Sequence, residues 1–169
     1  KTFQPTHVGS NANLLEDAFK FAKMGGTIDL TCGESESKFH SVADAVKKAK
    51  EEGVPMEKVT MSSDGQGSWS NYDAEGKLVE IGVSDVDTIY RQIVYMVKEE
   101  NMDLEELLAL GTKNPAMALE LYPKKGAVKE ESDADILIMN EDLSLDTVIA
   151  MGVPMMRDGK ILKKGTYEK

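Results

Sequence analysis

Two side chains of this sequence, His7 and Asp64, combine a reactive residue type with a position where α/β proteins build their sites. His7 lies at the carboxyl end of a predicted short strand near residues 3–8, and Asp64 follows a predicted strand at 59–62. Sites of α/β folds form at the carboxyl ends of parallel strands. Imidazole and carboxylate groups both bind zinc, and a carboxylate can also act as a general base. From the residues alone, a structural histidine and an aspartate that organises a glycine-rich turn remain open alternatives.

Other common catalytic patterns are missing from the sequence. It contains no dinucleotide-binding glycine fingerprint, no phosphate-binding P-loop, no HExxH and no CxxC. The second histidine, His40, lies in a polar stretch before a helix and has no comparable position. The single cysteine, Cys32, cannot form an internal disulfide, which favours a reducing compartment and predicts a cytoplasmic protein. A buried, inert thiol is the favoured interpretation of Cys32.

Composition excludes several classes of partner. The 169 residues include 30 acidic and 20 basic side chains, and the net charge is −10. Binding to nucleic acid or to an anionic membrane surface requires clustered lysine and arginine, so we expect neither partner. No apolar run approaches the roughly 20 residues that a membrane-spanning helix requires.

The elements that must position these side chains alternate between helix and strand. The apolar spacing predicts strands at 27–31 and 59–62, and helices at 14–24, 42–52, 85–97, from 104 and at 114–122. Connections of this length imply parallel pairing of the strands and an α/β layer. We expect residues 63–83 to form a long polar loop, which is usually functional or mobile.

The pattern changes after residue 124. Short strands are predicted at 136–139, 147–150, 154–157 and 160–162, with an Asp158-Gly159 hairpin turn between the last two. We therefore expect a domain boundary near Lys124. The first part offers only two or three parallel strands, whereas a closed parallel barrel requires eight, so it is expected to be an arc of a larger fold.

Several segments of the sequence resemble the isoaspartyl (β-aspartyl) dipeptidase family of the amidohydrolase superfamily. The segments that carry the resemblance are Pro5-Thr6-His7-Val8, residues 25–31, residues 59–68 with Ser-Ser-Asp-Gly-Gln-Gly-Ser, residues 72–76, residues 81–83, Lys125-Gly126, Asp133-Ala134-Asp135 and Lys164-Gly165-Thr166. The resemblance implies an α/β fold that is the C-terminal part of a metal-dependent hydrolase (β/α)8 TIM-like barrel, with strands of a small β-sandwich. Residues 1–124 would supply the last barrel strands and helices, and residues 125–169 the sandwich strands. The remaining barrel strands are expected to precede Lys1.

The resemblance also implies a chemistry. The family hydrolyses β-aspartyl dipeptides with two zinc ions and a metal-activated hydroxide. His7 corresponds to a ligand of one ion, and Asp64 to a ligand of the other that also shuttles the proton. Ser68 corresponds to a serine near the substrate, and Ser10 stands where the family has an arginine that holds the substrate α-carboxylate. The implied partner is a small dipeptide, and the full-length protein is expected to be a homo-oligomer.

The family's His-x-His pair, bridging lysine and further histidine are not found in these 169 residues. We therefore expect this segment alone to be inactive. Two other interpretations stay open: a non-catalytic binding module, and another amidohydrolase that acts on a cyclic amide. The Ser62–Ser68 stretch favours the dipeptidase over the second.

Overall fold

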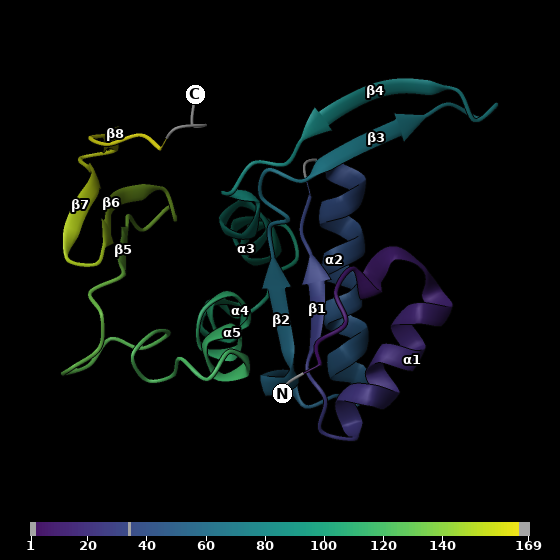
Figure 1. Ribbon diagram of the computed structural model, residues 1–169, viewed down its shortest axis with the longest axis horizontal. Coiled ribbons are helices and arrows are strands. Elements are labelled where there is room, and N and C mark those ends of the chain that lie inside the picture. The colour runs from purple at the N-terminus through teal and green to yellow at the C-terminus, as the bar shows by residue number, and fades with distance from the viewer. Residues whose placement is uncertain (1–2, 34, 166–169) are drawn as a thin grey trace.

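The fold is organised around two short parallel strands (Figure 1). The structure, a computed structural model, describes residues 3–33 and 35–165. Strand β1 (Ile28–Thr31) pairs in parallel with β2 (Val59–Ser62), with Ile28 opposite Val59. The predicted strands at 27–31 and 59–62 are confirmed to within a residue. Their β-branched and apolar side chains are buried, as expected for strands covered by helices.

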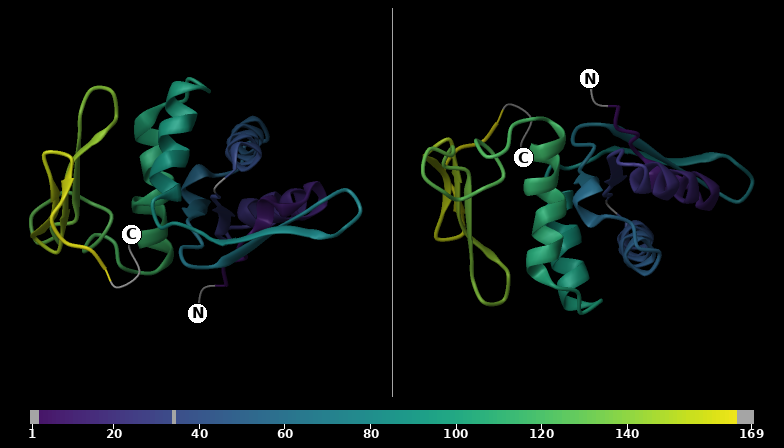
Figure 2. Two further views of the ribbon diagram at one scale, coloured as in Figure 1. Left: turned by 90° about the horizontal axis from the view of Figure 1, so that it is seen from above. Right: turned by 90° about the horizontal axis from the view of Figure 1, so that it is seen from below.

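Helices surround the strand pair in an arc (Figure 2). Helix α1 (Ala12–Lys23) and helix α2 (Glu36–Glu51) pack against β1, while α4 (Leu104–Gly111) and α5 (Lys113–Ala118) pack against β2. Helix α3 (Thr88–Lys98) lies between α2 and α4. The buried core joins all these layers through Phe19, Leu30, Val46, Met96 and Leu107. The short 3-10 helices are η1 (Val8–Ser10) and η2 (Met56–Lys58).

The expectation of a long loop at 63–83 is wrong. An antiparallel hairpin forms there from β3 (Ser68–Tyr72) and β4 (Leu78–Val83), and it projects from the helical body (Figure 1). Its turn is held by the Asp73 carboxylate, which accepts hydrogen bonds from two backbone N–H groups of the turn at 2.8 and 3.1 Å. The hairpin escaped prediction because most of its residues are exposed on both faces, so no alternation marks it.

Residues 136–161 form a four-stranded antiparallel sheet. Its strands are β5 (Ile136–Met139), β6 (Leu145–Ala150), β7 (Val153–Arg157) and β8 (Lys160–Ile161), in that order. The Asp158-Gly159 turn is confirmed, and both residues have positive φ, as a two-residue hairpin requires. The sheet lies beside α3, where the Tyr90 hydroxyl donates to the Leu143 carbonyl at 2.7 Å. The boundary near Lys124 stays a prediction.

Four further details correct the sequence interpretation. Residues 3–7 are not a strand, although the Asp29 N–H donates to the Pro5 carbonyl at 3.0 Å. Helix α1 is capped by Asn11, and α2 begins at Glu36 after the cap Ser35. Helix α5 ends at Ala118, before the expected end at residue 122. As the strand count predicted, the described residues form an open α/β arc and not a closed barrel. Among them, no helix has both the length and the apolar character that crossing a membrane requires.

Candidate active site

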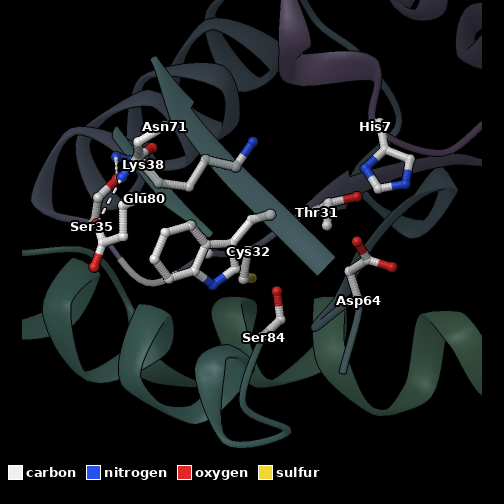
Figure 3. Close-up of a pocket in the computed structure, with 11 residues that line it drawn as sticks. His7, Thr31, Cys32, Ser35, Lys38, Asp64, Asn71, Glu80 and Ser84 are labelled. Carbon is white, nitrogen blue, oxygen red and sulfur yellow. Dashed lines mark hydrogen bonds between the residues drawn. The ribbon is translucent and has the colours of Figure 1, made fainter. Parts of the chain in front are cut away.

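A cavity of about 400 Å³ opens at the carboxyl ends of β1 and β2. His7 and Asp64 both line it, as do Thr31 and Cys32 from the end of β1 (Figure 3). In Figure 3, His7 and Asp64 lie on the same side of the cavity, with Thr31 beside them. The structure thus brings together the two side chains on which the sequence interpretation depends.

His7 is held by the turn that follows it. Its backbone has a φ of 58°, a left-handed conformation that costs energy for a residue with a Cβ. The N–H and the hydroxyl of Ser10 both donate to the His7 carbonyl, at 3.0 and 2.5 Å. These two bonds close the turn and hold the backbone of His7 in place. Ser10 therefore contacts the His7 backbone, and its side chain does not line the cavity.

Asp64 also has a left-handed backbone, with a φ of 49°. The Gly67 N–H donates to the Asp64 carbonyl at 2.8 Å, and a Cβ on Gly67 would lie 2.8 Å from the Asp64 carboxylate. Glycine at 67 is thus needed for the close approach of this turn. Within residues 3–33 and 35–165, neither the His7 imidazole nor the Asp64 carboxylate has a hydrogen-bond partner, so both can bind a ligand.

A buried carboxylate, Asp29, connects the two segments that carry these side chains. Its Oδ2 accepts hydrogen bonds from the Thr6 hydroxyl at 2.7 Å and the Ser62 hydroxyl at 2.6 Å. Its Oδ1 accepts from the Thr60 hydroxyl at 2.9 Å, and the whole residue is 5% exposed. Thr6 directly precedes His7, and Ser62 lies two residues before Asp64. Asp29 thereby joins the segment that carries His7 to the end of β2, which precedes Asp64.

Sequence reasoning missed Asp29. The available signal was a charged residue at the centre of an apolar strand, between Thr27 and Thr31, which places three polar side chains on one face. Its hydroxyl partners come from two other segments of the chain, and their spacing along the sequence does not reveal them.

The donor set suits a metal ion in part. A neutral imidazole and a carboxylate are both zinc ligands. The His7 imidazole and the Asp64 carboxylate line the same cavity, and neither has a hydrogen-bond partner among the described residues. Across the described parts of the chain, no cluster of three or more histidine, cysteine or acidic side chains is suited to hold a metal. Catalytic zinc usually has three protein ligands, so His7 and Asp64 alone do not form a complete zinc site.

Cys32 is an inert part of the wall. Burial raises the pKa of its thiol to about 12, and the nearby Asp29 charge acts in the same direction. The thiol therefore stays protonated at neutral pH and is a poor nucleophile and metal ligand. This agrees with the sequence interpretation of a buried, unreactive cysteine.

Ser68 and the second histidine, His40, lie outside the cavity wall. Ser68 is exposed at the start of β3, opposite Val83, and does not line the cavity. His40 is on α2, where its Nδ1 lies 2.5 Å from the Tyr95 hydroxyl, away from the site. The role of Ser68 in substrate binding stays a prediction.

The sequence matches the amidohydrolase family over residues 5–162. The chain belongs to this family of hydrolases.

Two solved structures from *Fervidobacterium islandicum* AW-1 resemble the chain along almost its whole length. One is a β-aspartyl dipeptidase in complex with β-Asp-Leu dipeptide, 36% identical, with a TM-score of 0.82 over 98% of this chain. The other is a further structure of a β-aspartyl dipeptidase, 33% identical, with a TM-score of 0.77 over 98% of this chain. The chain spans only 42% and 40% of the length of these two structures.

A more distant structure shares the fold alone. It is an adenosine deaminase from *Xanthomonas campestris* with bound zinc, 16% identical, with a TM-score of 0.53 over 96% of this chain and 39% of its own. Together these similarities agree with the resemblance found from the sequence.

Proposed function

We propose that the chain is the C-terminal part of a zinc-dependent isoaspartyl dipeptidase that hydrolyses β-aspartyl dipeptides in the cytoplasm. The observation that carries this proposal is the meeting of His7 and Asp64 in one cavity at the strand ends. The 36% identity to a β-aspartyl dipeptidase supports the substrate class. A completed (β/α)8 barrel and a second set of zinc ligands belong to the same proposal. The reduced, buried Cys32 supports the compartment.

Each side chain has a distinct part in the proposed reaction. His7 and Asp64 would hold zinc, which when bound polarises the scissile carbonyl and lowers the pKa of water. Asp64 would take the proton of the attacking water and deliver it to the leaving amine. Its turn, fixed by Gly67, keeps the carboxylate at the cavity wall. Asp29 and Ser10 act indirectly, because they hold the backbone segments that present Asp64 and His7.

The test is hydrolysis of β-Asp-Leu, with α-Asp-Leu as the comparison, by the intact polypeptide that contains these residues. We expect turnover of the β-linked peptide only. Asp64→Asn should lower kcat by about 100- to 10,000-fold, because general acid–base catalysis contributes that much. Asp17→Asn, which alters an exposed carboxylate on α1, should leave kcat unchanged. Equal turnover by wild type and Asp64→Asn would refute the proposed role.

A further inference from the structure

The cavity has a second end, opposite His7 and Asp64, whose chemistry the proposed reaction does not use. Lys38 of α2 and Asn71 and Glu80 of the β3–β4 hairpin lie there (Figure 3). The Lys38 amine extends from that end toward the middle of the cavity. Among the described residues, Lys38 is the only lysine or arginine that lines the cavity.

Among the side chains that the structure describes, which leave out those of residues 34, 36 and 37, the Lys38 amine has no acceptor, whereas several other lysines are paired. Lys47 and Lys125, for example, each form ion pairs with carboxylates at 2.5 Å. Glu80, a carboxylate at the same end of the cavity, instead accepts a hydrogen bond from Asn71 at 3.2 Å. A lysine ammonium is charged at neutral pH, and neither carboxylate of the cavity wall, Asp64 or Glu80, forms an ion pair with Lys38.

A second unmatched donor lines the same cavity. The indole Nε1 of Trp69 is buried and has no acceptor in the part of the chain that the structure describes. Such a donor costs free energy until an acceptor reaches it. The ring itself is fixed, because it packs directly over Gly82, where a Cβ would lie 2.2 Å from it. The Lys38 ammonium and the Trp69 indole N–H are thus two hydrogen-bond donors that an anionic oxygen ligand could pair with.

Ser10 does not supply this charge. Its hydroxyl donates to the His7 carbonyl within its own turn, and a serine carries no charge to neutralise a carboxylate. We propose that Lys38, with the Trp69 indole N–H as second donor, binds a free carboxylate of the substrate in the middle of the cavity, between its far end and the His7–Asp64 pair. The identity of the substrate rests on the proposed function, and the carboxylate-binding site itself rests on Lys38 and Trp69.

The first test measures kcat and KM of the intact polypeptide for β-Asp-Leu. Lys38→Met should raise KM about 10- to 100-fold with little change in kcat, because a bond to a charged group is lost equally in ground and transition states. Lys38→Arg should restore KM to near wild type. Lys20→Met removes an exposed lysine from α1 and should change neither constant. An unchanged KM in Lys38→Met overturns the proposal.

β-Asp-leucinamide, which lacks the carboxylate of the leaving residue, decides which substrate carboxylate is bound. If Lys38 binds that carboxylate, the amide should have a high KM that Lys38→Met does not raise further. If Lys38 binds the aspartyl carboxylate, Lys38→Met should raise KM for both peptides alike. A KM for both peptides that is insensitive to Lys38 overturns the proposal.

A binding measurement separates this inference from the proposed hydrolysis. Trp69 is the only tryptophan of the 169 residues. The difference in tryptophan fluorescence between the intact wild-type polypeptide and its Trp69→Phe variant is the fluorescence of Trp69. Titration with succinate should change Trp69 emission saturably in wild type, and Lys38→Met should abolish the change. Succinamide, which has no charge, should have no effect. Equal responses of wild type and Lys38→Met would refute the carboxylate site even if β-Asp-Leu is hydrolysed. A succinate response that depends on Lys38 would support the site even if no dipeptide is hydrolysed.

Discussion

Replacement of Asp29 by alanine tests whether one buried carboxylate holds the strand ends together. In the wild type, Asp29 accepts hydrogen bonds from the hydroxyls of Thr6, Thr60 and Ser62. Asp29→Ala removes both acceptor oxygens and with them all three hydrogen bonds. Thr60 keeps an alternative, since its hydroxyl also donates to the Ile28 carbonyl at 3.1 Å. Thr6 and Ser62 therefore suffer the main loss.

The expected cost follows from these two bonds. A hydrogen bond to a charged group contributes about 1.5–3 kcal/mol, so two lost bonds amount to about 3–6 kcal/mol. Removal of a buried charge regains part of its desolvation cost, and we expect a net loss of about 3 kcal/mol. Asp29→Asn should cost only about 1 kcal/mol, because the two hydroxyls can rotate and accept hydrogen bonds from the side-chain amide.

The assay is urea unfolding of the intact polypeptide, followed by circular dichroism. Asp17→Ala is the matched control, since its carboxylate on α1 is 74% exposed and pairs only with exposed Lys20, and it should stay within about 0.5 kcal/mol of wild type. An Asp29→Ala variant as stable as the control would refute the reasoning. A larger loss in Asp29→Asn than in Asp29→Ala would also contradict it.

Three further predictions concern the turn, the small sheet and the thiol. Gly67→Ala should lower turnover about 100-fold by displacing the Asp64 carboxylate, with an unchanged circular dichroism spectrum; unaltered kinetics would contradict this. Hydrogen bonds from the Lys125 ammonium and a backbone N–H lower the pKa of Asp135 below its ordinary value. A carboxyl whose pKa is lower in the folded than in the unfolded state stabilises the fold at pH values above its unfolded pKa. The stabilisation by Asp135 should therefore disappear as pH falls below about 4. In thermal melts across this pH range, Asp135→Asn should remove that part of the loss of stability in acid. Cys32, with a pKa of about 12, should resist iodoacetamide at pH 8 in the folded protein and react after unfolding; rapid labelling of the native protein would contradict its burial.

The sequence predicted those parts of the fold whose signals are local. Strand β2 is a short β-branched run, α4 begins at its expected cap Asp103, and the Asp158-Gly159 turn follows from positive φ at both residues. In each case neighbouring residues carry the information. The meeting of His7 with Asp64 was also predicted, although residues 3–7 lie beside β1 through the Asp29–Pro5 hydrogen bond and do not form the expected strand.

The parts that escaped prediction depend on distant contacts or on exposure. The β3–β4 hairpin exposes Tyr72 and Ile81 to about two thirds of their surface, 64% and 67%, so neither face shows an apolar pattern. Helix α2 extends further toward its N-terminus than expected, because Ser35 caps it through the N–H of Lys38. The Asp29 network joins residues more than 20 positions apart, which no spacing rule detects.

Zinc analysis of the intact polypeptide tests the central claim most directly. The claim is that His7 and Asp64 hold metal in one shared cavity. We predict that His7→Ala and Asp64→Ala each lose bound zinc relative to wild type, while His40→Ala, whose imidazole contacts Tyr95 on the helical surface, keeps the full amount. Full zinc content in both His7→Ala and Asp64→Ala would contradict the account.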